Sequence, residues 1–296
     1  MNSDLKLVES KLKKIVKISK NADLSKFCTF KIGGKAKLLI EPKSVEELIK
    51  TIDVLNTYKV KYLIVGNCSN ILFKSSGYNG VIIKMVGFNH IEFHGKKVIA
   101  ESGVSLTQLI KECVDRGLKG LEDGYLIPAT IGGAVRMNAS AFNFKTETCI
   151  DSVLAFVDGK IREYSKDECK FGYRTNIFKD GDIILRVQFN LEKGEKKQLK
   201  SRLNEILELR KQKLNNLPSA GCVFKNPIGY SAGQLIEDAC FKGYSIGGAM
   251  VSNKHANIIT NCGGATSEDV ENLIDLIIKT VKRLYNIDLE LEIKIY

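Results

Sequence analysis

Cysteine thiols are the most reactive side chains in this sequence, and the eight of them are scattered along its length. No two are spaced as a Cys-x-x-Cys pair, the arrangement that structural zinc sites and dithiol motifs use. In a long chain without a secretory signal, scattered cysteines are typical of reduced thiols in a cytoplasmic protein. The three histidines also have no pattern of carboxylates or thiols around them, so we expect no metal site. The residues concerned are Cys28, Cys68, Cys113, Cys149, Cys169, Cys222, Cys240, Cys262, His90, His94 and His255.

Glycines lie in or after short apolar runs at residues 33–34, 66 and 132–133. Backbone N–H groups in such turns can surround a phosphate, because glycine lets the chain approach an anion without a Cβ clash. Neither Gly-x-Gly-x-x-Gly nor Gly-x-x-x-x-Gly-Lys-Ser/Thr occurs, so a Rossmann dinucleotide site and a P-loop find no support. Taken alone, each of these turns is more often only a tight turn.

Short strands and helices, interleaved along the chain, must position these turns. Ser44 and Glu47 form a capping box at the start of an amphipathic helix. An apolar strand over residues 60–65 runs directly into the turn at Gly66. A second helix is expected over residues 105–116 because its apolar residues recur at helical spacing.

The middle of the chain contains an irregular segment, and after residue 191 the composition becomes charged and rich in Lys. Residues 127–141 have small side chains and no clear period, which predicts a structured loop. Residues 153–164 predict a hairpin, and residues 183–191 a strand. A Lys-rich charged linker follows over residues 192–200, and we place a domain boundary near residue 192.

The last part of the chain predicts a long helix over residues 268–285 with Ser267 as its N-cap. Residues 289–295 alternate strictly between apolar and polar, as a half-buried strand does. This alternation puts Glu290 and Glu292 on one face, which by pattern alone is a solvated polar face.

The amino-acid composition limits the classes of protein to which this chain can belong. The chain has 296 residues, 44% of them hydrophobic and 27% charged, which suits about two globular domains. Its formal charge of +11 comes from 45 Lys and Arg against 34 Asp and Glu, mostly scattered Lys. Nucleic-acid readers rely on Arg and on local clusters, whereas this chain has only eight Arg, and its basic residues form no local cluster. No segment approaches the length of an apolar membrane span.

Several segments form a pattern when they are taken together and in order. The segments are CTFKIGG (28–34), VGNCSNIL (65–72), GLE (120–122), IPATIGGAVRMNA (127–139), FGYR (171–174), SAGCVFKNP (219–227), AGQLIE (232–237), HAN (255–257) and LELE (289–292). The pattern spans roughly residues 27–295, nearly the whole chain. It resembles the UDP-N-acetylenolpyruvoylglucosamine reductase (MurB) family of peptidoglycan synthesis.

This resemblance implies an α+β fold with noncovalently bound FAD in a two-part domain of the vanillyl-alcohol-oxidase (PCMH) type, followed by an α/β substrate domain. We assign residues 1–26 to an N-terminal helical segment, 27–191 to the FAD-binding domain and 192–296 to the substrate-binding domain. The residues implied to contact FAD are Gly66, Asn67, Cys68, Ser69, Asn70, Pro128, Thr130, Gly132, Gly133, Ala134 and Asn138.

The sequence departs from the family pattern at two places. The family usually has three glycines where this chain has Gly-Asn-Cys at residues 66–68. It commonly has Gly-Ala-Tyr-Gly where this chain has Ser-Ala-Phe-Asn at residues 140–143. Both departures concern local FAD contacts. The tyrosine-bearing insertion of the longer branch is absent after Arg174, so the chain resembles the shorter branch.

The resemblance implies NADPH-dependent reduction of an enolpyruvyl ether to a lactyl ether, through FAD. Arg174 would bind the enolpyruvyl carboxylate or the developing enolate, and Tyr173 would form a wall of the site. Glu292 would polarise the enolate, as an acid or through a water. Cys222 would donate the proton, where most relatives have Ser. A thiol is a stronger acid than an alcohol, so this exchange is chemically reasonable.

Further substrate contacts are implied near the diphosphate and uridine. We expect the partners to be small molecules, NADPH and a UDP-sugar, with no nucleic acid and no membrane. We also expect a cytoplasmic monomer. The residues implied to bind substrate are Lys225, Asn226, Gln234, Glu237 and Lys242.

Two alternatives remain at this point. One is another flavoprotein of the same fold that oxidises sugars or alcohols, often with FAD tethered covalently. The other is a non-catalytic protein that binds nucleotides or nucleic acid, which the charge of +11 motivates.

Overall fold

A computed structural model describes residues 3–296, and these residues form two compact units. The first contains residues up to 20, 38–67 and 80–208, and the second contains residues 21–37, 68–79 and 209–296. The second unit therefore combines the C-terminal part of the chain with two short earlier segments. The assignment of residues 1–26, 27–191 and 192–296 to functional domains stays a prediction, since the compact units divide the chain differently.

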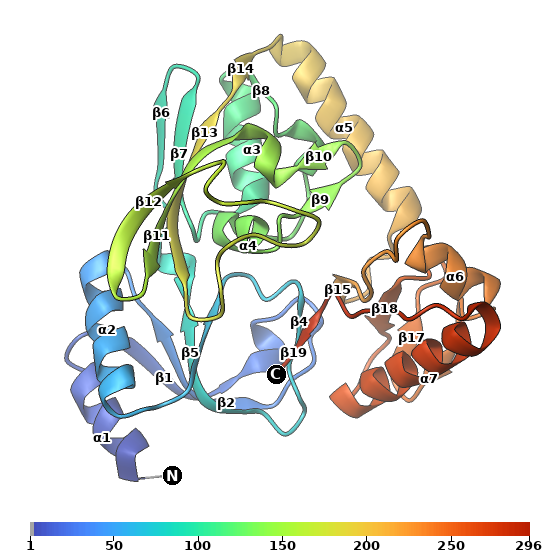
Figure 1. Cartoon of the computed structure of the whole chain (residues 1–296), viewed down its shortest axis with the longest axis horizontal. Coiled ribbons are helices and arrows are strands. Elements are labelled where there is room, and N and C mark those ends of the chain that lie inside the picture. The colour runs from blue at the N-terminus through green and yellow to red at the C-terminus, as the bar shows by residue number, and fades with distance from the viewer. Residues whose placement is uncertain (1–2) are drawn as a thin grey trace. The chain divides into compact units, whose positions relative to one another are not determined.

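A mixed sheet with two helices forms one part of the first unit (Figure 1). Its strands have the order β1-β2-β5-β3, and β3 runs parallel to β5. Ser44 caps α2 by accepting a hydrogen bond from the Glu47 N–H, as predicted, but the predicted capping box is incomplete because the Glu47 Oε2 accepts from the Lys43 N–H instead. Buried side chains of α1, α2 and these strands share one hydrophobic core. The bounds are α1 Ser3–Leu12, β1 Lys17–Asp23, β2 Lys35–Glu41, α2 Val45–Thr57, β3 Tyr62–Val65 and β5 Tyr78–Lys84.

The other part of the first unit is an antiparallel sheet of order β12-β11-β13-β7-β6 with a second core. The predicted hairpin is confirmed as β11 and β12, and the predicted helix over residues 105–116 is confirmed as α3. Two short ribbons, β8 with β14 and β9 with β10, complete this part. The bounds are β6 Ile91–His94, β7 Lys97–Glu101, α3 Leu106–Asp115, β8 Leu118–Lys119, α4 Ile131–Arg136, β9 Ser140–Ala141, β10 Phe144–Lys145, β11 Ile150–Val157, β12 Lys160–Ser165, β13 Ile183–Asn190 and β14 Glu192–Lys193.

The prediction of a loop throughout residues 127–141 is wrong, because α4 lies within it. Two glycines and the short length of the helix hide its period in the sequence. Contacts with residues distant in the sequence hold the helix. The N–H groups of Ile131 and Gly132 donate to the carbonyls of Val104 and Ser102, each at 2.8 Å.

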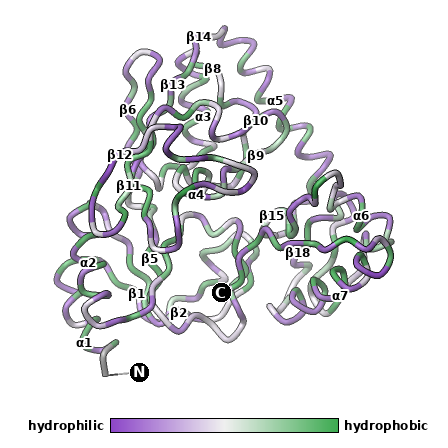
Figure 2. The backbone as a smooth tube through the Cα atoms, in the orientation of Figure 1, coloured by the Kyte–Doolittle hydropathy of each residue, from purple (hydrophilic) through white to green (hydrophobic). Residues whose placement is uncertain are grey.

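The second unit contains a small antiparallel sheet of order β15-β18-β17-β16, with α6 and α7. The long helix α5 begins in the first unit and ends in the second. Figure 2 shows both hydrophobic and hydrophilic residues along α7, whose apolar side is buried. The bounds are β4 Ile71–Leu72, α5 Lys196–Lys213, β15 Ser219–Cys222, α6 Ala232–Asp238, β16 Ser245–Ile246, β17 Ala249–Val251, β18 Ile258–Asn261, α7 Ser267–Tyr285 and β19 Lys294–Ile295.

The N-cap of α7 is Thr266, one residue before the predicted Ser267. Thr266 and Asp269 form a complete capping box. The Ser267 side chain is buried and used elsewhere, since its Oγ accepts from the Ser75 N–H at 2.8 Å. A tertiary contact therefore decided which of two adjacent hydroxyl residues caps the helix.

The predicted strand over residues 289–295 is mostly irregular. Only β19 pairs regularly, in parallel with β4, while Leu291 forms an isolated bridge with Phe224. The expected solvated polar face is also wrong at Glu292, which is only 8% exposed. The N–H groups of Glu292 and Ile293 both donate to one carbonyl, that of Val223, so a regular ladder does not form here.

None of the helices within residues 3–296 is long and apolar enough to cross a membrane.

Candidate active site

The turn that follows β3 is built against residue Thr130 within the first unit. A Cβ placed on Gly66 would lie 2.2 Å from the Thr130 Oγ1, so no other residue fits there without a shift. The next residue, Asn67, donates from Nδ2 to the carbonyl of Pro128 at 2.8 Å. The two glycine-containing segments predicted to contact a cofactor are therefore held together directly.

The N-terminus of helix α4 is capped by Thr130, the residue that precedes it. Thr130 caps the helix by accepting from the Gly133 N–H at 3.3 Å. A Cβ on Gly132 would lie 2.9 Å from the Cβ of Ser102, which shows how closely the helix packs on that residue. Because the N–H groups of residues 131–133 are bonded within the protein, this helix does not present them to a phosphate. Ala134 is buried in the core.

The turn continues in the second unit with residues 68–70. Cys68 is buried and has a positive φ of 50°, a left-handed conformation that can gather successive N–H groups around an anion. Asn70 donates from Nδ2 to the backbone carbonyl of Glu292 at 3.0 Å. The carbonyl oxygen of Ser69 lies 4.0 Å from the position of a Cβ on Gly221. These contacts place residues 68–70 next to the segments that carry Cys222 and Glu292.

Cys222 is the last residue of β15 and is half-buried. The strand is irregular before it, since Gly221 has a φ of +75° and the register with β18 shifts between Ser219 and Cys222. After it, the Val223 N–H donates to the carbonyl of Asn257, and the Val223 carbonyl accepts from the Glu292 N–H, both at 2.8 Å. The backbones that carry Cys222 and Glu292 are thus neighbours within one unit.

Three of the remaining cysteines, Cys113, Cys149 and Cys169, are buried in surroundings that suit structural roles. Burial raises the pKa of the Cys113 thiol to about 12 and the pKa values of Cys149 and Cys169 to about 11. Such thiols stay protonated and inert. Cys240 and Cys262 are exposed on the second unit. No group of three or more His, Cys, Asp or Glu within residues 3–296 could hold a metal ion.

Arg174 lies in the first unit, in a tight turn between Gly172 and Thr175. Its own φ is +56°, and the N–H groups of Gly172 and Thr175 each donate to the other residue's carbonyl. Its Nη1 donates to the Ser140 Oγ at 2.9 Å and to the Asn138 carbonyl at 3.3 Å. The guanidinium also lies 5.6 Å from the ring centre of Tyr173, whose side chain is exposed.

Asn138 holds this turn in place. Its buried side chain donates from Nδ2 to the Glu147 Oε2 at 2.7 Å and to the Gly172 carbonyl at 2.8 Å. Its Oδ1 accepts from the Glu147 N–H at 3.3 Å. Both amide hydrogens are therefore in use inside the protein. The contact between Asn138 and the cofactor stays a prediction.

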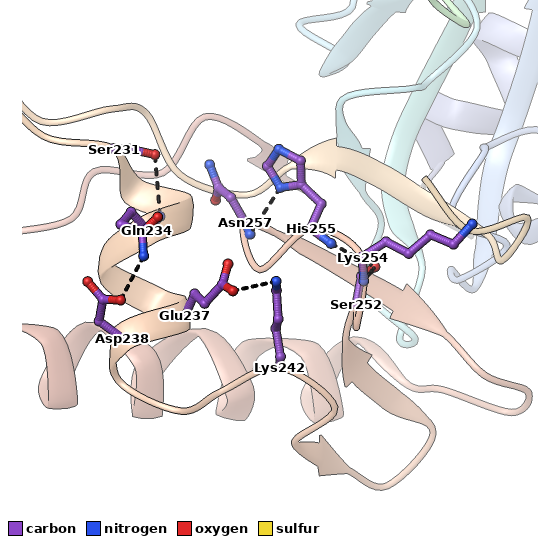
Figure 3. Close-up of polar contacts among 9 residues, drawn as sticks. All are labelled: Ser231, Gln234, Glu237, Asp238, Lys242, Ser252, Lys254, His255 and Asn257. Carbon is purple, nitrogen blue, oxygen red and sulfur yellow. Dashed lines mark hydrogen bonds and ion pairs between the residues drawn. The ribbon is translucent and has the colours of Figure 1, made fainter. Parts of the chain in front are cut away.

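Five of the predicted substrate residues lie in the second unit, and Figure 3 shows three of them, Gln234, Glu237 and Lys242. Lys225 pairs with Glu290, and the Asn226 Oδ1 accepts from the N–H of Ala232 at the start of α6. On α6, Gln234 donates to Asp238 at 2.7 Å. Glu237, on the same helix, pairs with Lys242 at 2.6 Å.

His255 and Asn257 form the end of this cluster, and sequence reasoning gave neither a role. The His255 Nδ1 accepts from the Asn257 N–H at 3.3 Å, so a neutral ring carries its proton on Nε2. Burial, together with Lys213 and Lys242, lowers the pKa of His255. The signal in the sequence was the His-Ala-Asn segment at residues 255–257, which the resemblance contained but did not explain.

Family models match both parts of the chain. Residues 36–165 match the FAD binding domain, and residues 212–296 match the C-terminal domain of UDP-N-acetylenolpyruvoylglucosamine reductase. This confirms the predicted order, an FAD-binding domain followed by a C-terminal domain. The chain is therefore an FAD-dependent flavoprotein oxidoreductase.

Relatives cover the chain almost completely. A UDP-N-acetylenolpyruvoylglucosamine reductase of Caldanaerobacter subterraneus subsp. tengcongensis is 40% identical, over 98% of each chain. One of Clostridium botulinum (strain Eklund 17B / Type B) is 37% identical, over 99% of this chain and 98% of the relative. The crystal structure of the reductase (MurB) from Thermus caldophilus superposes with a TM-score of 0.81 at 33% identity, over 95% of this chain and 98% of that one. The chain belongs to the UDP-N-acetylenolpyruvoylglucosamine reductase family.

The turn at residues 66–70 fits the pyrophosphate of FAD. Gly66 leaves no room for a side chain beside Thr130, and Cys68 supplies the left-handed backbone of an anion-binding turn. The usual three glycines are not required for this shape, because Cys68 adopts the conformation with its side chain buried.

Proposed function

We propose that this chain reduces UDP-N-acetylglucosamine enolpyruvate to UDP-N-acetylmuramate, with NADPH as the reductant. The observation that carries the proposal is the pairing of the backbones that bear Cys222 and Glu292, through the Val223 carbonyl. A thiol and a buried carboxyl group carried on adjoining backbones suit the delivery of one proton to a carbon next to a carboxylate.

The turn at residues 66–70 and the segment 127–139 would hold FAD, which when bound would supply hydride chemistry for the vinyl group of the substrate. Arg174 binds the enolpyruvyl carboxylate, where negative charge grows as the vinyl carbon is reduced. A guanidinium already held by hydrogen bonds to Ser140 and Asn138 needs little reorganisation to do so.

Glu292 polarises the enolate, and Cys222 completes the reaction. The Cys222 Sγ–H bond breaks as its proton passes to the carbon that bears the carboxylate, and the thiolate regains a proton from water. Lys225, Asn226, Gln234, Glu237 and Lys242 bind the nucleotide part of the substrate, and the substrate displaces or shares the contacts that these side chains now make within the protein.

The same proposal assigns FAD binding to residues 27–191 and substrate binding to residues 192–296, in a cytoplasmic monomer that needs no membrane or nucleic-acid partner. Sedimentation of the flavin-loaded protein tests the monomer: a mass near 32.9 kDa supports it, and twice that mass contradicts it.

The Cys222→Ala variant tests the role of the thiol by separating the two half-reactions. We expect NADPH to reduce the bound flavin at the wild-type rate, while reduction of the enolpyruvyl sugar nucleotide falls by about a hundredfold or more. Cys222→Ser retains a weaker acid and should keep part of that rate. Cys262→Ala, at an exposed thiol of the same unit, is the matched control. If Cys222→Ala reduces the sugar nucleotide as fast as the wild type, Cys222 is not the proton donor.

A further inference from the structure

The Ser140 hydroxyl is a direct hydrogen-bond partner of Arg174. The Arg174 Nη1 donates to the Ser140 Oγ at 2.9 Å, a shorter contact than the 3.3 Å to the Asn138 carbonyl. The two acceptors lie two residues apart in the chain and meet the same nitrogen. A glycine, which the resembled family pattern commonly has at residue 140, would remove the shorter of these two contacts.

Backbone contacts with neighbouring segments hold the main chain at Ser140. It is the first residue of β9 and pairs with Lys145 of β10, and the next pair contains the buried Phe144. The Phe144 ring packs so closely on Gly124 that a Cβ there would lie 3.1 Å from it. Just before Ser140, the carbonyl of Ala139 accepts from both the N–H and the Oγ1 of Thr146. The backbone that carries the hydroxyl is therefore held on both sides.

A fixed hydrogen-bond acceptor lowers the entropy cost of ordering an arginine side chain when the substrate binds. The long Arg side chain has many rotamers, and freezing it at the moment of binding costs entropy. A charge-assisted hydrogen bond that already holds Nη1 removes part of that cost before the substrate arrives.

We propose that Ser140 is a positioning residue that fixes the Arg174 guanidinium for the enolpyruvyl carboxylate. This inference rests on the role of Arg174 in the proposed function. Ser140 acts through Arg174, so its removal affects only the step in which the sugar nucleotide is bound and reduced.

The experiment compares Ser140→Ala, Ser140→Gly and Ser140→Thr in the flavin-loaded, full-length protein. We expect Ala and Gly to lower kcat/KM for the enolpyruvyl sugar nucleotide about tenfold, the usual effect of losing one hydrogen bond to a charged group. Anaerobic reduction of the flavin by NADPH should keep its wild-type rate. Ser140→Thr retains the Oγ and should restore most of kcat/KM.

A double-mutant cycle with Arg174→Lys shows whether Ser140 acts through Arg174. Lysine cannot span the same contacts, so Ser140→Ala should cost much less in that background than in the wild type. Equal losses in both backgrounds, or equal slowing of both half-reactions, would overturn the inference and leave Ser140 a purely structural residue.

Arg174→Lys alone separates this inference from the proposed function. If Arg174→Lys leaves reduction of the sugar nucleotide unchanged, the assignment of Arg174 fails, and Ser140 loses its role with it. If Arg174→Lys slows that step and Ser140→Ala matches the wild type, only the inference about Ser140 fails.

Discussion

Asn257 binds the backbone of Phe224 with both ends of its side-chain amide. Its Oδ1 accepts from the Phe224 N–H at 2.9 Å, and its Nδ2 donates to the Phe224 carbonyl at 2.8 Å. Both residues are almost completely buried. The Asn257 carbonyl also accepts from Val223, whose own carbonyl accepts from Glu292. One amide therefore holds the segment that links the two predicted catalytic residues of the second unit.

Replacing Asn257 by Ala should destabilise the protein strongly. Two backbone groups of Phe224 would be left buried without partners, at a cost of about 1–3 kcal/mol each. We expect a clear fall in the urea midpoint of the flavin-loaded protein. Asn257→Asp keeps an acceptor for the N–H but places an oxygen against the Phe224 carbonyl, so it should also lower stability. Asn253→Ala, at an exposed residue of the same unit, should change stability by less than about 0.5 kcal/mol. An unchanged midpoint for Asn257→Ala would refute this reading.

The two glutamates of the C-terminal segment form a matched pair for testing catalysis. Glu292 is buried, whereas the Glu290 side chain is 73% exposed and pairs with Lys225. Glu292→Gln keeps the shape but not the charge, and should slow reduction of the sugar nucleotide by about a hundredfold. Glu290→Gln should lower the same rate by less than about threefold, since exposed ion pairs contribute little. The reverse ranking in stopped-flow measurements would assign the role to Glu290.

Gly66→Ala should weaken the binding of FAD. The added Cβ would lie 2.2 Å from the Thr130 Oγ1, so the turn or the cap of α4 must move. Overpacking of this kind costs about 1–3 kcal/mol, which we expect to appear as a rise of about 5- to 150-fold in the Kd for FAD. In a Thr130→Ala background the Oγ1 is gone, and the same substitution should cost less. Equal losses in both backgrounds would show that Thr130 is not the obstacle.

His255 should give the protein a pH-dependent stability on the acid side. Burial is the main cause that lowers its pKa in the folded protein below the ordinary value of 6.5, with Lys213 and Lys242 acting in the same direction. The unfolded chain then takes up a proton at a higher pH than the folded chain does. Stability is therefore fully present above about pH 6.5 and falls as the pH drops toward the folded-state pKa, by at most about 1.4 kcal/mol per pH unit.

The His255→Gln variant isolates this contribution. Urea unfolding of both proteins between about pH 7.5 and pH 5 should show a steeper loss of stability for the wild type. His94→Gln is the control, because His94 is an exposed side chain of the first unit. Parallel curves for wild type and His255→Gln would mean that His255 titrates alike in the folded and unfolded states.

Elements whose signals are local could be predicted from the sequence. The cap Ser44, the hairpin of β11 and β12 and the helix α3 each depend on residues a few positions apart, and each is confirmed. The ordered motifs were also enough to predict the family, because that comparison needs residue types and their order but no contacts.

Contacts between distant residues decided the rest. The alternation at residues 289–295 treats Glu290 and Glu292 alike, and only the pairing with Val223 buries one of them. The hydroxyl of Ser140 acquires an arginine partner 34 positions away, and Asn257 a backbone partner 33 positions away. The sequence by itself determined the family, the local elements and the residue types available for the chemistry. Which of those residues are buried, and what holds them, depended on the tertiary structure, because hydrogen bonds and burial form between segments that no local pattern connects.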